Sequence, residues 1–476
     1  MKNENYIHKL LTQFAADPAA LTALEIYDGK QIRKIGYRQL AEDCLAAAGY
    51  FAEKGIRRQN IALIGANSYL WLVGFLGITA SDNTAVLLNP DLPAELLREQ
   101  CAVTETSVVC GDRKEIPALS EEIAMFPLEE IRGSIPVQPE LLAAPGEQDI
   151  CVMMFTSGTT GTGKAVMLTC ENLAACICGG EDVFSEPGIR KILTVLPMFH
   201  ISGLRGTLAM LYRHKTVCLG RGPMYLFKDL PVLEPDYAPL VPMMAESIAK
   251  RMKIAGDRDS WKSFLGGNLN RLFVGGASVP VAVCRYLMEQ GFTLDSGYAM
   301  TETCGVGTWS EWREERYGTI GKLTEGIQCR IEDGELLFKG PAVMAGYYGD
   351  PEETARVLKD GWLRTGDLGY CDEDGYYYLT GRKKNLMVFS NGKKVSPEEI
   401  EGELSRCGDI QECLIFGEKD AVCAEIYSKN RTAVEKWMKD YNERMPLYRQ
   451  VRKVIYRDAP LEKTASGKIK RRKGAL

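Results

Sequence analysis

The sequence predicts an α/β protein that is built from more than one domain. Three observations support this prediction. The chain has 476 residues, and soluble domains usually hold about 100–200 residues each. Its composition is 45% hydrophobic and 25% charged, which is typical of a globular protein with a large core. Helical and strand-like patterns alternate along most of the chain, as they do in layered α/β domains.

The first unit is expected over about residues 1–145. Apolar residues at helical spacing lead to a Gly stop at Gly55, and short apolar runs follow that helix. The order of the patterns indicates β-α-β packing. The expected elements are a helix over 38–55, a strand over 60–67, a buried helix over 69–80 and a strand over 84–90.

The same alternation continues over about residues 146–325, with strands expected at "KILTVLP", "TVCLG" and "RLFVGGA". Over 326–381 the pattern changes to β-rich runs separated by Asp/Gly turns, which predicts hairpins. Beyond these, "VSPEEIEGEL" predicts a helix that opens with a Ser cap, a Pro and two Glu.

The charge is uneven along the chain. Residues 382–476 contain 22 Lys and Arg against 14 Asp and Glu, a net charge of +8, so residues 1–381 carry −13 of the total of −5. A basic segment on an acidic body indicates an anionic ligand or partner near the C-terminal end. The alternative is a solvated basic tail.

Several function classes are excluded by composition. No apolar run reaches the roughly 18–20 residues that a membrane-spanning helix needs, and the first residues lack a signal-peptide layout. The 15 cysteines are scattered without a C-x-x-C pair, and the chain has three histidines. We therefore expect reduced thiols, a cytoplasmic location, no zinc cluster, no transmembrane segment and no nucleic-acid partner.

One stretch predicts phosphate binding. Residues 155–166 read "FTSGTTGTGKAV", which is close to a Walker loop. A Walker loop continues into a helix, and a Ser or Thr follows its Lys. Here Ala165 and an apolar, β-leaning run follow Lys164, so we expect a loop between two strands. Small residues let backbone N–H groups approach phosphate oxygens, and the hydroxyls add donors.

This loop resembles the phosphate loop of the adenylate-forming enzymes, which include acyl- and aryl-CoA synthetases, luciferases and the adenylation domains of peptide synthetases. Their pattern is [ST]-S-G-[ST]-[ST]-G-x-P-K-G, and this chain departs from it at Gly163 and Ala165. Further stretches resemble the family in the same order, with Ala299 replacing a Gly in the third: "LPMFHISG", "VGGASVP", "DSGYAMTET", "GELLFKGPAVMAGYY", "WLRTGDLGY", "GRKKNLMVFSNGKKVSPEEIE" and "PLEKTASGKIKRR". The fourth of them is expected to be structural.

The resemblance implies roles for individual residues. It places Tyr298 on the adenine, Asp367 and Arg382 on the ribose, Thr301 on the α-phosphate and magnesium on Glu302. It also implies that Lys468 is the catalytic lysine, that His200 lies where the acyl group enters, and that Lys384 is the hinge. The other residues that it assigns to ATP are Thr156, Ser157, Gly158, Thr159, Thr160, Gly161 and Lys164 in the loop, and Gly276, Ala277, Ser278, Asp295 and Gly297 near the base.

The resemblance also refines the fold. It implies a large N-terminal domain over 1–381, made of two layered α/β subdomains and a small β-barrel-like subdomain. A hinge at 382–384 would join this body to a small, mobile α+β domain over 385–476.

The implied reaction has two steps. A carboxylate attacks the α-phosphate of ATP to give an acyl-adenylate and pyrophosphate, and a thiol then displaces AMP. ATP, Mg²⁺, CoA and a small-molecule carboxylic acid are therefore the expected ligands. An amino acid is disfavoured, since "MFHISG" is the version seen in fatty- and aryl-acid enzymes. A fatty acid is favoured, because "KAVMLT" and "GRKKNLMVFSNGKKVSPEEIE" look most like the corresponding stretches of bacterial fatty acyl-CoA synthetases.

Other interpretations remain open. A carrier protein with a phosphopantetheine arm is an alternative acceptor to CoA. The acid could be an aryl acid or a succinylbenzoate-type acid, with Arg205 pairing a second carboxylate, although an exposed or structural Arg205 is the favoured interpretation. A non-catalytic sensor is disfavoured, because Glu302, Asp367 and Lys468 are all present.

Overall fold

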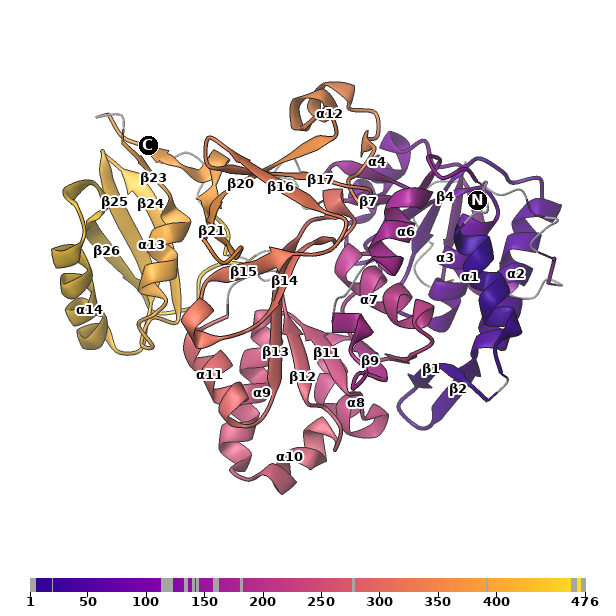
Figure 1. Ribbon diagram of the computed structural model, residues 1–476, viewed down its shortest axis with the longest axis horizontal. Helices are drawn as coiled ribbons and strands as arrows, with labels where there is room; N and C mark the ends of the chain where they lie inside the picture. Colours follow the sequence, from indigo (N-terminus) through magenta and orange to yellow (C-terminus); the bar gives the residue numbers. More distant parts are fainter. Residues whose placement is uncertain are drawn as a thin grey trace.

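The computed structural model shows an α/β body and a smaller C-terminal domain, which confirms the predicted fold class (Figure 1). The body contains two large sheets, and the C-terminal domain lies at one end of the molecule. The structure describes residues 6–18, 20–112, 123–131, 136–138, 142, 145–156, 162–179, 183–275, 279–390, 393–463 and 469–471.

The first sheet has a parallel centre and an antiparallel edge. Strands β3 and β4 pair in parallel, as a β-α-β unit requires, and the helix between them is apolar on every side. In the described part of the chain the order across the sheet is β18 (Gly346–Tyr347), β8 (Ala165–Thr169), β7 (Ile150–Phe155), β4 (Thr84–Leu88), β3 (Asn60–Ile64), β5 (Val108–Gly111) and β6 (Ala124–Pro127).

The second sheet joins the other α/β layer to the β-rich part. Its parallel strands continue through β13 into antiparallel strands, so the predicted hairpins extend this sheet. The order is β16 (Gln328–Glu332), β17 (Glu335–Lys339), β20 (Trp362–Cys371), β21 (Tyr377–Arg382), β15 (Thr319–Leu323), β14 (Gly307–Glu311), β13 (Thr293–Ala299), β12 (Arg271–Val274), β11 (Tyr237–Leu240), β9 (Lys191–Thr194), β10 (Thr216–Leu219), β1 (Thr22–Tyr27) and β2 (Ile32–Gly36), with β19 (Leu358–Lys359) on β20.

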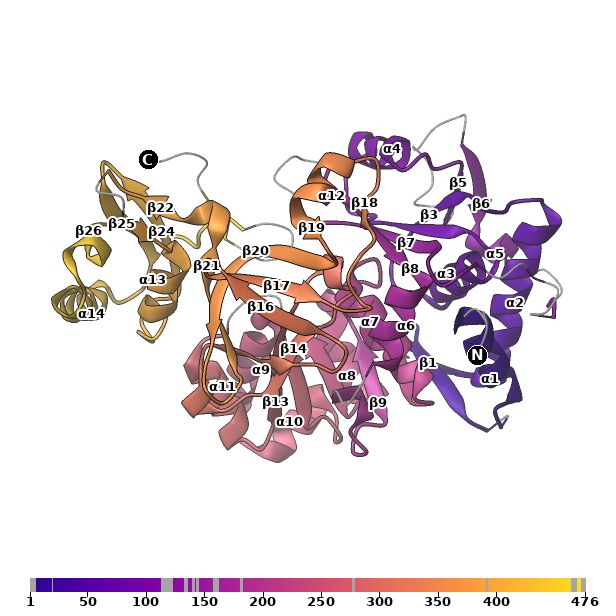
Figure 2. The same cartoon turned by 45° about the horizontal axis from the view of Figure 1, so that its top comes forward.

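Helices cover the sheets and connect them (Figures 1 and 2). The α-helices of the body are α1 (Tyr6–Ala16), α2 (Tyr37–Glu53), α3 (Tyr69–Ala80), α4 (Ala94–Val103), α5 (Leu128–Ile131), α6 (Cys170–Cys178), α7 (Ile201–Tyr212), α8 (Leu226–Leu233), α9 (Pro242–Ala255), α10 (Arg258–Leu265), α11 (Val281–Glu289) and α12 (Pro351–Val357). The short 3-10 helices of the body include η2 (Val183–Ser185), η3 (Pro223–Tyr225), η4 (Thr301–Thr303) and η5 (Glu314–Arg316), and η6 (Lys383–Asn385) follows β21 at the predicted hinge.

The two sheets do not divide the chain at about residue 145. Strand β1 near the start of the chain pairs with β10, so it belongs to the second sheet. Strands β7 and β8, which follow residue 145, belong to the first sheet. Each sheet therefore contains strands from both sides of residue 145. The boundary between the two α/β subdomains stays a prediction.

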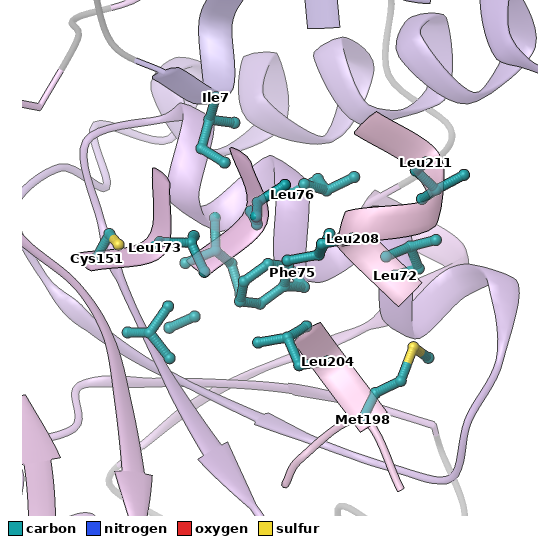
Figure 3. Packing of buried hydrophobic residues seen from close by; sticks show 14 of the residues in the cluster. Ile7, Leu72, Phe75, Leu76, Cys151, Leu173, Met198, Leu204, Leu208 and Leu211 are labelled. Carbon is teal, nitrogen blue, oxygen red and sulfur yellow. The ribbon is translucent and has the colours of Figure 1, made fainter. Parts of the chain in front are cut away.

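One apolar core joins the two α/β layers. Figure 3 shows Phe75 of α3 facing Leu204 and Leu208 of α7, with Leu173 of α6 beside them. These side chains are at most 1% exposed, and burial of each contributes about 1.5–3 kcal/mol. Because α3 follows a strand of the first sheet and α7 follows a strand of the second, this packing fixes the two layers against each other.

The C-terminal domain has a hydrophobic core of its own. Its sheet has the order β24 (Glu412–Glu418), β25 (Ala421–Tyr427) and β26 (Val451–Arg457), beside the hairpin β22 (Met387–Val388) and β23 (Lys394–Val395). Helices α13 (Pro397–Leu404) and α14 (Arg431–Arg444), with η7 (Leu447–Arg449), complete the domain. Ser396 occupies the cap position of α13, as predicted, but its hydroxyl donates to Glu398 (3.0 Å) and makes no cap hydrogen bond.

Two further expectations concern the whole chain. No helix in the described ranges combines the length and the apolar character that crossing a membrane requires. All 15 cysteines are free thiols, in agreement with the prediction that the chain has no disulfide framework.

We predict that Arg271→Met strongly destabilises the fold. Arg271 of β12 donates two hydrogen bonds to Asp295 of β13 (2.7 and 2.8 Å), and Asp295 is 1% exposed. Removing the guanidinium leaves a buried carboxylate without its partner, which costs about 3–5 kcal/mol. Urea unfolding measures the loss. The control is Arg285→Met, because its exposed pair with Glu314 contributes about 0–1 kcal/mol, and equal losses would contradict the prediction.

Candidate active site

The glycine loop connects two antiparallel strands, as the sequence predicted. Phe155 of β7 pairs with Ala165 of β8, and the Thr156 N–H donates to the Lys164 carbonyl (3.1 Å) at the base of the loop. The Walker interpretation is therefore wrong, since no helix starts at Lys164. The other predicted loop residues, Ser157, Gly158, Thr159, Thr160 and Gly161, lie outside the described residues.

Gly163 explains one departure from the family pattern. Its φ is +77°, and a Cβ atom there would lie 2.3 Å from the Thr156 carbonyl oxygen. Proline fixes φ near −65° and cannot adopt this conformation. The backbone conformation at position 163 is therefore one that a proline cannot adopt, and glycine is the residue that fits it.

Tyr298, Asp367 and Arg382 come together from three strands. The Tyr298 hydroxyl donates to Oδ2 of Asp367 (2.5 Å), and Nε of Arg382 lies 2.7 Å from Oδ1 of Asp367. Asp367 is 3% exposed, and burial, together with the Asp367 charge, raises the pKa of Tyr298 well above its usual value. The phenol therefore stays protonated at neutral pH and keeps donating to the carboxylate.

Other residues predicted near the base have different surroundings. Asp295 is a buried residue of β13, and Arg271 of β12 donates to both of its carboxylate oxygens. Burial raises the pKa of Asp295 even though Arg271 lowers it. Gly297 lies on β13 one residue before Tyr298. Gly276, Ala277 and Ser278 lie outside the described residues.

Glu302 is a buried carboxylate at the end of the same strand. It lies on η4, which follows β13, and it is 8% exposed. The Tyr347 hydroxyl donates to its Oε1 (2.9 Å), and the Met344 N–H donates to its backbone carbonyl (2.9 Å). Both partners come from the stretch "GPAVMAGYY", which the sequence indicated to be structural. Tyr347 was missed because no sequence pattern places its hydroxyl on Glu302.

The surroundings of Glu302 fit a magnesium ion. Among the residues that the structure describes, no Lys or Arg forms an ion pair with Glu302, and no group of three or more His, Cys, Asp or Glu forms a metal cluster. Burying a carboxylate without a cation is costly, so a divalent cation would supply the missing charge. Mg²⁺ accepts such a sparse site, because waters and substrate phosphates complete its octahedral coordination.

Lys164 is held close to Glu302 without pairing with it. Its ammonium lies 4.8 Å from the centroid of the Tyr347 ring, and it forms an ion pair with Glu353 of α12. Arg356 and Lys164 lower the pKa of Glu353 to about 2. Glu353 is therefore anionic at neutral pH and keeps Lys164 at the edge of the glycine loop.

Helix α7 carries Arg205, and His200, which was predicted to lie where the acyl group enters, is the cap residue in front of it. His200 precedes the first turn of α7 and is exposed, yet the surrounding protein lowers its pKa by desolvation. Arg205 is half-buried, and its guanidinium lies 5.3 Å from the Phe184 ring. Gly305 packs against α7, because a Cβ atom there would lie 3.1 Å from Cδ of Arg205. Thr301 begins η4 and is half-buried.

The hinge and the C-terminal lysine segment lie on the C-terminal side of β21. Lys384 is exposed on η6, and its neighbour Asn385 donates to Glu398 (2.6 Å). Lys468 lies outside the described residues. The described residues on either side of it are anchored to the C-terminal domain, with Lys463 bound to Glu412 (2.6 Å) and Arg471 bound to Glu401 (2.7 Å) and Glu398 (3.0 Å).

Comparison with known families identifies the class of enzyme. The model described as AMP-binding enzyme matches residues 11–348, and the model described as AMP-binding enzyme C-terminal domain matches residues 384–475. The predicted resemblance to the adenylate-forming superfamily is thereby confirmed. The chain belongs to the AMP-binding enzyme family.

Curated relatives are named as ligases that act on carboxylic acids. The chain is 27% identical over 542 residues to the long-chain-fatty-acid–CoA ligase of Bacillus subtilis, covering 98% of this chain and 93% of that protein. It is also 27% identical to the 2-succinylbenzoate–CoA ligase of Listeria innocua, with 95% of each chain covered. Together with the family match, these names confirm the prediction of an AMP-forming acid–thiol ligase.

Solved structures share the fold. The O-succinylbenzoate coenzyme A synthetase from Bacillus subtilis in complex with AMP has a TM-score of 0.82 at 23% identity, covering 97% of this chain and 96% of that one. The anthranilate CoA ligase AuaEII in complex with anthranoyl-AMP has a TM-score of 0.82 at 22% identity, covering 98% and 97%. The likeness covers both the body and the C-terminal domain.

We predict that Asp367→Asn weakens ATP binding. The change removes the charge from the acceptor that Tyr298 and Arg382 hold in place, and a hydrogen bond to a charged group contributes about 1.5–3 kcal/mol. We expect the Kd for ATP to rise about 10–100-fold in calorimetric titrations, without a loss of the folded state. The control is Asp372→Asn in the turn after β20, where Asp372 pairs with Arg316. An unchanged Kd for Asp367→Asn would refute the ribose role.

Proposed function

We propose that the chain is an ATP- and Mg²⁺-dependent fatty acid–CoA ligase that works through an acyl-adenylate. One observation carries this proposal: the consecutive elements β13 and η4 each contribute a residue to a different cluster of polar side chains. Tyr298 meets Asp367 and Arg382 at one end of the segment, and Glu302 meets Tyr347 beside Lys164 at the other. This spacing suits a nucleoside at one end and its phosphates at the other.

The nucleoside end provides positioning. Tyr298 offers a ring for the adenine, and the ionised Asp367 offers oxygen acceptors for the ribose hydroxyls. Arg382 holds the carboxylate in one orientation through two N–H groups (Nε at 2.7 Å and Nη2 at 3.3 Å). Holding the reactants in a fixed geometry can supply several kcal/mol of rate acceleration.

The phosphate end provides positive charge. The first step brings a carboxylate against a polyanion, so cationic groups and N–H donors must stabilise the developing charge. Magnesium bound at Glu302 would supply Lewis-acid charge stabilisation when present. Lys164, the glycine-loop donors and Lys468 would contribute the protein's own share, and Thr301 would contact the α-phosphate.

Support for a fatty acid comes from a relative of nearly full length. The Bacillus subtilis protein that covers 98% of this chain is named a long-chain-fatty-acid–CoA ligase. A solved structure of similar fold, with a TM-score of 0.75, is a fatty acyl CoA synthetase of Mycobacterium tuberculosis. His200 at the start of α7 fits an acid without an α-ammonium group, because its lowered pKa keeps the imidazole neutral.

A second candidate is a succinylbenzoate-type acid. Arg205 lies half-buried on α7 against Gly305, five residues after His200. A guanidinium there could pair with a second carboxylate. The Listeria innocua relative is named for 2-succinylbenzoate.

The acceptor in the second step is proposed to be CoA. The +8 charge of residues 382–476 complements the phosphates of CoA. A phosphopantetheinyl carrier protein offers similar chemistry and is the alternative acceptor.

Pyrophosphate release with a panel of acids tests the proposed function. We expect release with ATP, Mg²⁺ and a long-chain fatty acid, and AMP release that requires CoA. Short-chain, aryl and dicarboxylic acids serve as comparison substrates. If the wild-type chain turns over an aryl acid with a second carboxylate, and Arg205→Met abolishes that turnover, the second candidate is established instead. Adenylate that forms but never passes to CoA would point to a carrier protein.

We predict that Lys384→Pro impairs thioester formation more than adenylate formation. The proposed second step requires rotation of the C-terminal domain about the exposed η6 turn, and proline removes that backbone freedom. Each half-reaction is measured separately, the second from preformed acyl-adenylate. Lys468→Ala should give the opposite pattern and serves as the matched comparison. Equal losses in both half-reactions for Lys384→Pro would disprove the hinge role.

A further inference from the structure

The second-to-last residue of "GPAVMAGYY" lies inside the candidate site. Tyr347 is on β18, a two-residue strand that pairs with Val166 and Met167 of β8 (Figure 2). It is 6% exposed, and its hydroxyl donates to Oε1 of Glu302 (2.9 Å). Tyr347 is therefore fixed by its backbone to β8, the strand that follows the glycine loop, and by its side chain to Glu302.

The backbone around Tyr347 is firmly held. The Ala345 N–H donates to Met167 (3.0 Å), and the Tyr348 N–H donates to Ala165 (2.8 Å). The Tyr347 N–H donates to the Thr354 hydroxyl (2.9 Å). Gly346 has a φ of +147°, and a Cβ atom there would lie 2.7 Å from Cγ2 of Thr354. These hydrogen bonds and the close packing at Gly346 fix the backbone, so the Tyr347 side chain can hold a neighbouring side chain in one orientation.

The ring of Tyr347 also faces a cation. The Lys164 ammonium lies over the ring at 4.8 Å, which favours an attractive cation–π contact, and Lys164 pairs with Glu353. Lys164 is thus satisfied by the ring and by Glu353. Within the described residues Glu302 accepts a neutral hydroxyl and pairs with no lysine or arginine, so its charge remains available for an added cation.

We propose that Tyr347 is a positioning residue that orients Glu302 for a divalent cation. The inference rests on the proposed function, in which Glu302 binds magnesium. A carboxylate that binds a metal is commonly held by a hydrogen bond to an outer residue, and removing that residue typically costs 10–100-fold in metal affinity. The Tyr347 hydroxyl is such a partner, because it donates to Oε1 of Glu302 at 2.9 Å.

The test removes the hydroxyl and keeps the ring. Tyr347→Phe should preserve the contact with Lys164 and lose only the hydrogen bond to Glu302. Binding of Mn²⁺ is measured by electron paramagnetic resonance on the full chain, with a non-hydrolysable ATP analogue present. We expect the Kd for Mn²⁺ to rise about 10-fold, while the Kd for AMP, measured without metal, stays unchanged. Tyr348→Phe is the matched control, because the Tyr348 hydroxyl binds Glu105 (2.6 Å).

Two further variants separate this inference from the proposed function. Glu302→Gln should weaken Mn²⁺ binding at least as much as Tyr347→Phe does, and the double variant should show no added loss, because both act through one carboxylate. Wild-type Mn²⁺ binding by Tyr347→Phe alone would overturn the positioning role. Wild-type binding by Glu302→Gln would overturn the metal role of Glu302, and the positioning role with it.

Discussion

The buried carboxylate of Asp367 is the constraint on which the candidate site depends. A carboxylate that is 3% exposed must be compensated by partners, since burying an unpaired charge is costly. Its partners come from different parts of the chain, with Tyr298 on β13 and Arg382 at the end of β21. The second α/β layer, the β-rich part and the start of the hinge therefore meet at a single side chain. A shift of any of them would weaken the compensation of this charge.

Around Glu302 the charges are separated. Lys164 is paired with Glu353 and lies over the Tyr347 ring, whereas Glu302 receives only a phenol hydroxyl among its described side-chain partners. If Lys164 paired directly with Glu302, both charges would be neutralised and neither would favour a metal–phosphate ligand. The present arrangement pairs Lys164 with Glu353 instead, so that the Glu302 carboxylate accepts only a neutral hydroxyl among its described side-chain partners. This is the electrostatic preorganisation that the proposed phosphoryl chemistry needs.

The arrangement of the cores matches the proposed two-step reaction. The two α/β layers share one apolar core through α3, α6 and α7 (Figure 3), so they form a firm support for the site. The C-terminal domain packs a separate cluster that includes Ile400, Leu404 and Ile415. Rotation of that domain would therefore leave its own core intact. The ion pairs of Lys463 with Glu412 and of Arg471 with Glu401 join groups within the C-terminal domain.

The sequence by itself determined the local elements and the chemistry-bearing motifs. The apolar run over 69–80 predicted a buried helix, and the absence of a helix after Lys164 predicted a strand–loop–strand unit. Such features depend on neighbours along the chain. The tertiary structure alone decided which distant groups meet: Tyr347 with Glu302, Arg271 with Asp295, and β1 with β10. These contacts join residues 24 to about 190 positions apart, and long-range packing that no local pattern encodes selects them.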